Sequence, residues 1–437
     1  MTKLRGVRHA YPDDLAEAAR GRWKHLSEDG VATTAAQRAA LEHGALEMLL
    51  SVAYQSSMLT EEGRPCTFRM LVAEPDDLDA GAGPPDGLHR LRFAAPYPLT
   101  PHEVRKLSRA AKPSRALLGV RVAARGPEIW GLLHSGPRWL QATHGGRGVR
   151  TGLPPGALVI ASPGVGQVTV SRGVALVAEL RAGMLITQPF DVLASGWLPG
   201  WWRPIRDRVM EEHRAARPEG ETWGDVDPNV IRLIAVQLLK RIIATVRDAG
   251  HGGTLLVVPD VEAIANVVQI HHAFADEEPR RRYRTLLQRA LAILARSTST
   301  SVSALGWDAY DTSESPELAQ VDEAILEIAH LIANLADVDG AVVITRRFEI
   351  LGFGAEIVGR ADVGTIRRAL DLEARHTVEE SSSGVGTRHR SAYRFIAQLP
   401  DAVAIVISQE GSVRFVHGTP AGVTCWNHVP SAENAER

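Results

Sequence analysis

The sequence predicts an α/β protein with two parts: a C-terminal mixed-sheet domain flanked by helices, and an N-terminal α+β domain. Residues 254–258 and 402–407 are continuous apolar runs, the pattern of strands buried on both faces. Between these runs, longer segments repeat apolar residues at helical spacing. Before about residue 198, glycine and proline join shorter elements. With 437 residues, 45% of them hydrophobic, the chain can form more than one core.

The expected N-terminal elements are short. We expect a helix over residues 36–51, followed by strands over 67–74 and 88–94. Thr100 is a suitable cap, and Pro101 fits the first turn of a helix that runs to about residue 111. The remaining expected elements are paired strands over 117–123 and 128–133, and strands separated by glycine turns over 157–186.

A polar and charged segment over residues 203–226 predicts the domain boundary. The expected division is a domain of unknown role over residues 1–220, a second domain over 227–420, and a C-terminal tail over 421–437.

The second domain alternates helices and strands. Asp227 and Pro228 begin a helix that Gly250 ends, and Ser315-Pro316 begins another. The other expected helices cover residues 281–296, 363–374 and 385–398. The expected strands are 254–258, then 341–345 with an antiparallel return over 348–357, and then 402–407 with a hairpin partner over 412–417.

Composition excludes several classes of protein. The formal net charge of −2 at pH 7 gives no overall attraction for nucleic acid, so we expect no nucleic-acid partner. No apolar run reaches the length of a membrane span, and no signal peptide begins the chain. Cys66 and Cys425 match no zinc-binding pattern. We therefore expect a cytoplasmic protein without a membrane partner.

The stretch Gly386-Thr387-Arg388-His389-Arg390 places groups that bind anions at the start of an amphipathic helix. The first N–H groups of a helix have no intrahelical partner, and the helix dipole favours negative charge there. The planar guanidinium groups of arginine suit phosphate oxygens. These residues predict a phosphate site, although a solvated basic helix start, with arginines paired to carboxylates elsewhere, remains the alternative.

The second motif, Asp339-Gly340-Ala341, joins a long predicted helix to a predicted strand. Simple turn chemistry explains an aspartate followed by glycine at such a junction. A carboxylate close to a triphosphate could also bind Mg²⁺ or accept a proton from a sugar hydroxyl.

Together, the two motifs resemble those of the diadenylate cyclase family, which includes the nucleotide-binding domain of the DNA-integrity scanning protein. Residues 251–257 are similar to an early strand of that family, and residues 404–410 are similar to a late one. The sequences of residues 352–357 and 386–395 are more similar to a divergent branch of the family, the DACNV-type sensor domains. The resemblance covers residues 227–420, less than half of the chain.

The resemblance implies that two ATP molecules are joined into cyclic di-AMP, with release of pyrophosphate, in a face-to-face homodimer. It implies catalytic roles for Asp339, Arg388, His389 and Arg390, and binding of ATP or a related adenine nucleotide. The residues that it implies for substrate binding are Gly340, Ala341, Gly386, Thr387 and Ser408. It also implies Mg²⁺ or Mn²⁺ as cofactor, held by Asp339 and Glu410.

Two departures from the family pattern support a different function. Val338 stands where active members carry a histidine, and the late acidic motif is shortened to Ser408-Gln409-Glu410-Gly411. The alternative is therefore a non-catalytic nucleotide sensor domain of a bacterial signalling or conflict system.

Overall fold

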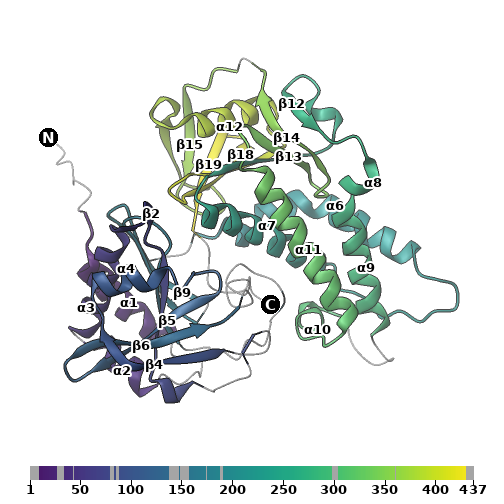
Figure 1. Ribbon diagram of the computed structural model, residues 1–437. Helices are drawn as coiled ribbons and strands as arrows, with labels where there is room; N and C mark the ends of the chain where they lie inside the picture. The colour runs from purple at the N-terminus through teal and green to yellow at the C-terminus, as the bar shows by residue number, and fades with distance from the viewer. Residues whose placement is uncertain are drawn as a thin grey trace. The chain divides into compact units, whose positions relative to one another are not determined.

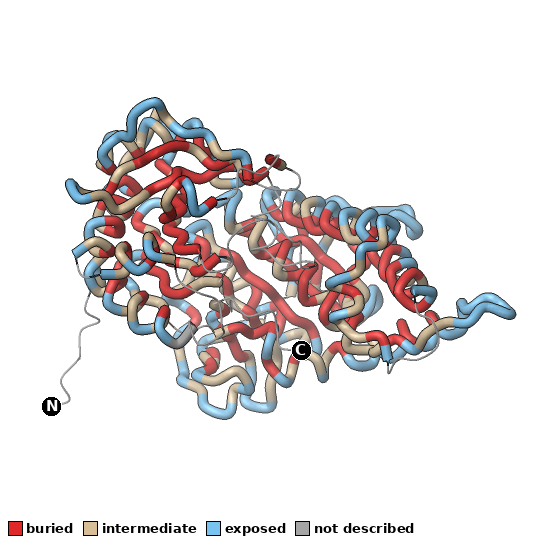
Figure 2. The backbone as a smooth tube through the Cα atoms, turned by 90° about the horizontal axis from the view of Figure 1, so that it is seen from below, coloured by how far each residue is buried: buried red, intermediate tan, exposed pale blue. Residues whose placement is uncertain are grey.

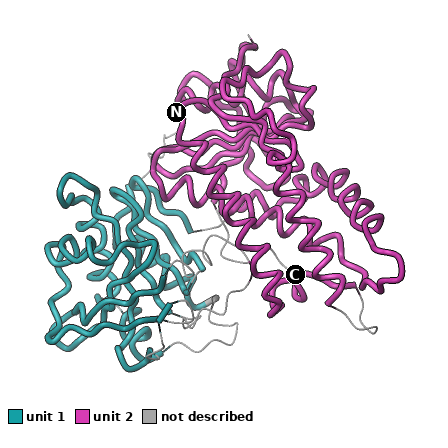
Figure 3. Tube along the Cα trace, turned by 45° about the vertical axis from the view of Figure 1, so that its right-hand side comes forward, with its two compact units in different colours: residues 1–143, 149–189, 431–433 teal, residues 144–148, 190–430, 434–437 magenta. Residues whose placement is uncertain are grey.

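A computed structural model describes residues 9–26, 34–42, 44–78, 83–84, 88–136, 147, 157–173, 175–187, 190–297, 304–359 and 361–429. The chain forms two compact units, coloured teal and magenta in Figure 3. Unit 1 contains residues 1–143, 149–189 and 431–433, and unit 2 contains residues 144–148, 190–430 and 434–437. None of the helices that the structure describes combines the length and the apolar composition of a membrane-spanning segment.

The division between the units differs from the boundary expected near residue 220. Unit 2 already includes helix α6 (Trp197–Ala215), because Leu198, Val209 and Met210 of that helix belong to its core. The expected C-terminal tail also differs, since strand β19 (Gly422–His428) belongs to the sheet of unit 2.

Unit 1 is an α+β unit around an eight-stranded sheet with the order β10-β9-β8-β7-β3-β5-β6-β4. Its helices are α1 (Pro12–Leu26), α2 (Ala35–Leu41), α3 (Ala45–Ser57), α4 (Pro101–Ser108) and the short 3-10 helix η2 (Pro75–Asp77). Its strands are the pair β1 (Thr60–Glu61) and β2 (Arg64–Pro65), and then β3 (Phe68–Val72), β4 (His89–Pro98), β5 (Ala116–Ala123), β6 (Gly126–His134), β7 (Leu158–Ser162), β8 (Gln167–Arg172), β9 (Ala175–Arg181) and β10 (Met184–Ile186).

The central strands of unit 1 are buried on both faces. In β3, Phe68, Met70 and Val72 join a core with α1 and α3, whereas Leu71 joins a smaller core with Trp130 on the other face. Side chains that alternate between two cores explain why all five residues of β3 are buried.

Unit 2 is built on a nine-stranded mixed sheet with the order β12-β14-β13-β11-β17-β18-β19-β15-β16. Besides β19, its strands are β11 (Gly253–Val258), β12 (Val268–Ala273), β13 (Ala341–Thr345), β14 (Ile350–Ile357), β15 (Thr365–Ala369), β16 (Thr377–Ser381), β17 (Val403–Ile407) and β18 (Val413–Thr419). Besides α6, its helices are η3 (Val192–Ala194), α7 (Asn229–Ala249), η4 (Glu262–Ile264), α8 (Glu277–Arg280), α9 (Arg282–Arg296), α10 (Trp307–Asp311), α11 (Pro316–Leu335), η5 (Ser382–Gly384) and α12 (Thr387–Gln398). Figure 1 shows this arrangement of helices around the sheet.

Each face of this sheet packs against a different set of helices. In β11, Leu255 and Val257 face the core that contains α7, α9 and α11. Leu256 and Val258 face the second core, which contains the buried side of α12. The central strands are accordingly drawn as buried in Figure 2. The predicted α/β class, with a mixed sheet in the C-terminal part and an α+β N-terminal part, is confirmed.

Two predicted helices are wrong. Residues 363–374 contain strand β15, because Ile366 is buried in the sheet and Arg367 and Arg368 pair with β16 and β19. The single helix expected over 36–51 is two helices, α2 and α3, separated at Gly44, whose φ of 88° is incompatible with a continuous helix.

Candidate functional site

The two sequence motifs meet at one edge of the unit 2 sheet. Strand β11 runs parallel to β13, with Leu255 opposite Val342, and antiparallel to β17, with Gly253 opposite Ile407. The start of β11, the start of β13 and the end of β17 therefore form a single edge, which we call the motif edge. Asp339 lies just before β13 and Ser408 just after β17, so the sheet brings both predicted site residues to this edge.

Close backbone packing fixes the start of β13. Gly340 has a φ of +104°, and a Cβ atom there would lie 2.6 Å from the carbonyl carbon of Gly354 in β14. Only glycine meets both conditions without strain. Asp339 is exposed beside it, whereas Ala341 is buried and begins the strand. The motif thus presents one accessible carboxylate next to a closely packed strand terminus.

Helix α12 begins without a side-chain cap. Its N-cap residue is Gly386, which makes no capping hydrogen bond through a side chain. Thr387 is exposed, and its Oγ1 accepts a hydrogen bond from Nη2 of Arg390 at 3.4 Å. Because a glycine cap leaves the first N–H groups accessible, this helix start can receive an anion.

Arg388 connects this helix start to the motif edge. A Cβ atom at Gly252, where φ is +68°, would lie 2.8 Å from Nη1 of Arg388 and 2.8 Å from the carbonyl oxygen of Ile407. The guanidinium group therefore lies beside the turn that leads into β11, next to the end of β17. A glycine at position 252 leaves the room for it.

His389 is held in its neutral form. Burial, and then the positive charges of Arg414 and Arg388, lower the pKa of His389 to about 4. Its ring lies 6.5 Å from that of Tyr393, whose hydroxyl accepts a hydrogen bond from Nη1 of Arg414 at 2.9 Å. At neutral pH this imidazole can donate one hydrogen bond and accept another without adding charge.

Ser408 and Glu410 lie in the hairpin turn after β17. The amide N–H of Ser412 donates to Oγ of Ser408 at 3.0 Å, and the two serine hydroxyls lie 2.8 Å apart. The Ser408 hydroxyl therefore stabilises this turn. If Ser408 also binds substrate, the same hydroxyl must make both contacts. Glu410 is exposed in the same turn.

The predicted metal ligands, Asp339 and Glu410, lie just before β13 and in the turn after β17, two strands that β11 separates. Since neighbouring strands are about 4.8 Å apart, the ends of β13 and β17 next to these residues are about 10 Å apart. No group of three or more His, Cys, Asp or Glu side chains that could hold a metal ion occurs among the described residues. A divalent cation here would therefore need oxygen atoms from a nucleotide as well.

The sequence motifs did not indicate Arg414, whose positive charge lies near His389 and helps to lower the pKa of that histidine. A signal was available, because Val413 and Phe415 face one core of the sheet and Val416 faces the other. Alternation along β18 therefore places Arg414 on the face that α12 covers. A second missed contact joins His251 to Asp337, with Nδ1 and Oδ1 3.4 Å apart.

Two family models match the chain. Residues 317–420 match the family described as DisA bacterial checkpoint controller nucleotide-binding, which confirms the resemblance to the diadenylate cyclase family over that segment. Residues 36–134 match the family described as Probable sensor domain DACNV. The sensor match therefore falls in unit 1, for which the sequence motifs predicted no role.

The other comparisons add little. No curated protein matches the chain. A crystal structure of a hypothetical membrane spanning protein from Bacillus cereus is similar at 13% identity and a TM-score of 0.23, over 53% of this chain and 92% of that one. A similarity at that TM-score carries no argument about this protein.

Proposed function

We propose that unit 2 binds ATP or a related adenine nucleotide at the motif edge, and that two copies face each other to condense two ATP into cyclic di-AMP. One observation carries the proposal. Arg388, from the start of α12, lies beside Gly252 and the end of β17, on the edge where Asp339 precedes β13. A guanidinium group, a helix start and an exposed carboxylate thus share one edge, in a segment that matches a nucleotide-binding family.

In the proposed reaction, the 3′-oxygen of one ATP attacks the α-phosphorus of the other, and the bond from that phosphorus to the bridging oxygen of the β-phosphate breaks. Pyrophosphate leaves, and the proton of the 3′-hydroxyl passes to the carboxylate of Asp339 or to water. A second, identical step closes the ring. Because each copy supplies one nucleotide, two motif edges must face each other. Catalysis then comes mainly from position and electrostatics.

The start of α12 would hold the phosphates. Arg388 and Arg390 supply positive charge, and Thr387 is exposed beside them. Neutral His389 can donate a hydrogen bond to a phosphate oxygen or to departing pyrophosphate. Asp339, together with nucleotide oxygens, would hold a Mg²⁺ or Mn²⁺ ion, which would neutralise phosphate charge.

The second candidate is a nucleotide sensor that does not cyclise its ligand. One structural observation favours it: Val338, directly before Asp339, is 44% exposed at the motif edge. An apolar side chain there cannot help to hold a metal ion. The match of residues 36–134 to a sensor family also supports this candidate.

Mass spectrometry separates the two candidates. Purified full-length protein is incubated with ATP and Mg²⁺ or Mn²⁺, and the products are searched for cyclic di-AMP. We expect product, and we expect Asp339→Ala to lower its rate about 100-fold or more, because the variant loses the group that orients or deprotonates the hydroxyl. Glu323→Ala removes an exposed carboxylate from α11 and serves as the matched control.

Calorimetry on the same samples gives the ATP affinity. ATP binding without product, from protein that is folded by circular dichroism, would replace the enzyme proposal with the sensor. Folded protein that binds no nucleotide would defeat both candidates.

A further inference from the structure

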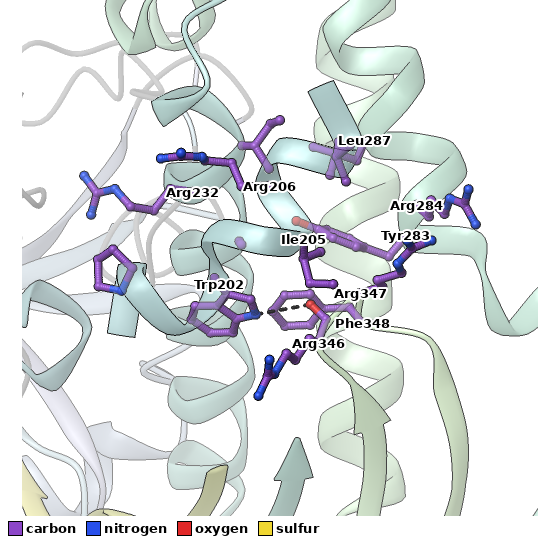
Figure 4. Close-up of a pocket in the computed structure, with 14 residues that line it drawn as sticks. Trp202, Ile205, Arg206, Arg232, Tyr283, Arg284, Leu287, Arg346, Arg347 and Phe348 are labelled. Carbon is purple, nitrogen blue, oxygen red and sulfur yellow. Dashed lines mark hydrogen bonds between the residues drawn. The ribbon is translucent and has the colours of Figure 1, made fainter. Parts of the chain in front are cut away.

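Unit 2 contains a pocket away from the motif edge, between α6, α7, α9 and the turn from β13 to β14 (Figure 4). The space between its lining residues is about 600 Å³ when the part that is open to solvent is counted. Its walls are largely apolar and include Trp202, Ile205, Leu287 and Phe348. A largely apolar lining with a few polar groups is typical of sites for small organic ligands.

One buried polar group in this pocket has no partner. Tyr283 is 3% exposed, and its hydroxyl makes no hydrogen bond to any of the described residues. Figure 4 shows the hydroxyl pointing into the pocket. Burial raises the pKa of Tyr283, so the group remains a protonated donor at neutral pH. A buried donor without an acceptor is unfavourable, and a ligand oxygen would satisfy it.

Arginines surround the same pocket. The five that line it are Arg206, Arg232, Arg284, Arg346 and Arg347. Three carboxylates form ion pairs with members of this set: Asp207, Glu212 and Asp401. Glu212 forms ion pairs with both Arg284 and Arg347. Asp227 and Glu349 also lie near Arg232 and Arg347, so the arginines of the rim stand among carboxylates, and Arg206 and Arg232 are a pair that repel each other.

Arg232 is the arginine best placed to attract an anion. Its Nε donates to the neutral amide oxygen of Asn229 at 2.6 Å. Burial, and then the charge of Arg206, lower the pKa of Arg232 despite the opposing effect of Asp227. An anionic ligand would relieve the repulsion between Arg232 and Arg206.

We propose that this arginine-rimmed pocket binds a small amphipathic anion, with its apolar body against Trp202 and Phe348. An anionic oxygen of the ligand accepts a hydrogen bond from Tyr283, and Arg206 and Arg232 neutralise its charge. A carboxylate or a phosphate ester on an alkyl or aryl body has this chemistry.

The pocket does not depend on the proposed nucleotide function. Arg346, Arg347 and Phe348 directly follow β13, whereas Asp339 precedes it, so the two places lie at opposite ends of one strand. A ligand in the pocket therefore does not compete for the groups of the motif edge. The Asp339→Ala variant is expected to bind the probes below as the parent protein does.

The test is calorimetry on the full-length protein with three probes of ten carbons each: decanoate, decyl phosphate and decanol. We expect at least one of the two anions to bind about tenfold or more tightly than decanol. The anion forms a charge-assisted hydrogen bond, whereas decanol can form only a neutral one. The order of decanoate and decyl phosphate distinguishes the two possible headgroups. Equal affinity for all three probes, or no binding of any, would overturn the proposal.

Variants locate the bound probe. Tyr283→Phe removes only the hydroxyl, so it is expected to weaken the preferred anion about tenfold without lowering the unfolding midpoint in urea. Arg232→Gln is expected to weaken it about threefold or more, with a smaller effect at high salt. Arg289→Gln, exposed on α9, is the matched control and leaves affinity unchanged. Full affinity in both Tyr283→Phe and Arg232→Gln would place the probe elsewhere and contradict the proposal.

Discussion

The two ends of strand β13 differ in what they present. Before the strand, Val338, Asp339 and Gly340 are exposed, and glycine allows the backbones of β13 and β14 to meet. At the other end, Thr345, the last residue of the strand, and Phe348, which follows it, are only 4% and 2% exposed. The first end leaves its polar groups accessible to a ligand, whereas the second packs its side chains into the core. We therefore expect substitutions at the first end to change nucleotide affinity, and those at the second to change the free energy of unfolding.

The largest expected effect is at the enclosed end. Phe348 stacks on Trp202 with ring centroids 5.9 Å apart and lies 4.9 Å from the ring of Tyr283. Phe348→Ala is expected to lower the free energy of unfolding by about 3–5 kcal/mol, because it removes a buried aromatic ring and leaves a cavity. Urea denaturation followed by tryptophan fluorescence measures this. Val338→Ala, at the open end, is the comparison and should change stability by less than about 0.5 kcal/mol. Equal losses of unfolding free energy in the two variants would contradict the proposed difference between the two ends of β13.

Gly340→Ala is expected to cost about 2–4 kcal/mol, although Gly340 itself is exposed. The new Cβ would meet the backbone of Gly354, which cannot move without shifting β14. Gly250→Ala is the control, since Gly250 has a φ of +73° but no atom within 4 Å of the added Cβ. Its cost should be about 1 kcal/mol, from the backbone conformation alone. If Gly340→Ala costs no more than Gly250→Ala in urea denaturation, close packing does not fix the start of β13.

Titration of two histidines compares the motif edge with the opposite edge of the sheet. The pKa of His389 is lowered to about 4, and nearby phosphate charge would favour the protonated imidazole. We therefore expect saturating ATP to raise the pKa of His389, as measured by NMR. His417 is the internal control: it lies opposite Val403 at the other edge of the sheet, and its pKa is lowered mainly by burial. Its titration should not change with ATP, and an equal shift in both would argue against binding at the motif edge.

The sign of the associated pH effect follows from the lowered pKa. An unfolded histidine titrates near 6.5, so between about pH 6.5 and pH 4 the unfolded chain binds the proton and folded His389 does not. The contribution of His389 to stability is therefore complete above pH 6.5 and decreases as the pH falls towards 4. Bound ATP should raise the lower limit of this pH range, because it raises the pKa of folded His389. Urea denaturation at several pH values, with and without ATP, measures the change.

The smallest expected effect is that of Gly386→Ala. Gly386 has φ −64° and ψ 164°, and no atom lies within 4 Å of an added Cβ. The free energy of unfolding should therefore fall by only about 0.5–1 kcal/mol, the cost of alanine in place of glycine at an N-cap. The free energy of ATP binding should weaken by more than the free energy of unfolding does, because the added methyl group would lie where phosphate approaches the helix start. Unchanged affinity would mean that the ligand does not contact the backbone at Gly386.

Local signals in the sequence predicted most of the elements that carry the site. Thr100 and Ser315 accept capping hydrogen bonds from Glu103 and Leu318, and Gly250 ends α7 in the left-handed conformation, as expected. The apolar runs at 254–258 and 402–407 correspond to β11 and β17. Caps and fully apolar strands are recognisable because their causes lie within a few residues of sequence.

Features that depend on distant partners could not be predicted in the same way. Ile366 and Ala369, three residues apart, fit a helical stripe, but pairing with β19 and β16 makes the segment a strand. The arginine-rimmed pocket combines Trp202, Tyr283 and Phe348 from three separate segments. No spacing within any one of these segments indicates the other two.

The most direct test of the nucleotide site is the ATP affinity of two arginine variants of α12, measured by calorimetry on the full-length protein. Arg388 lies beside Gly252 at the motif edge, whereas Arg394 is exposed six residues further along the same helix. We expect Arg388→Ala to weaken ATP about 10- to 100-fold, because a charge-assisted contact to phosphate is lost. Arg394→Ala is expected to leave the affinity within about twofold. Equal affinity in the two variants would contradict a nucleotide site at the motif edge.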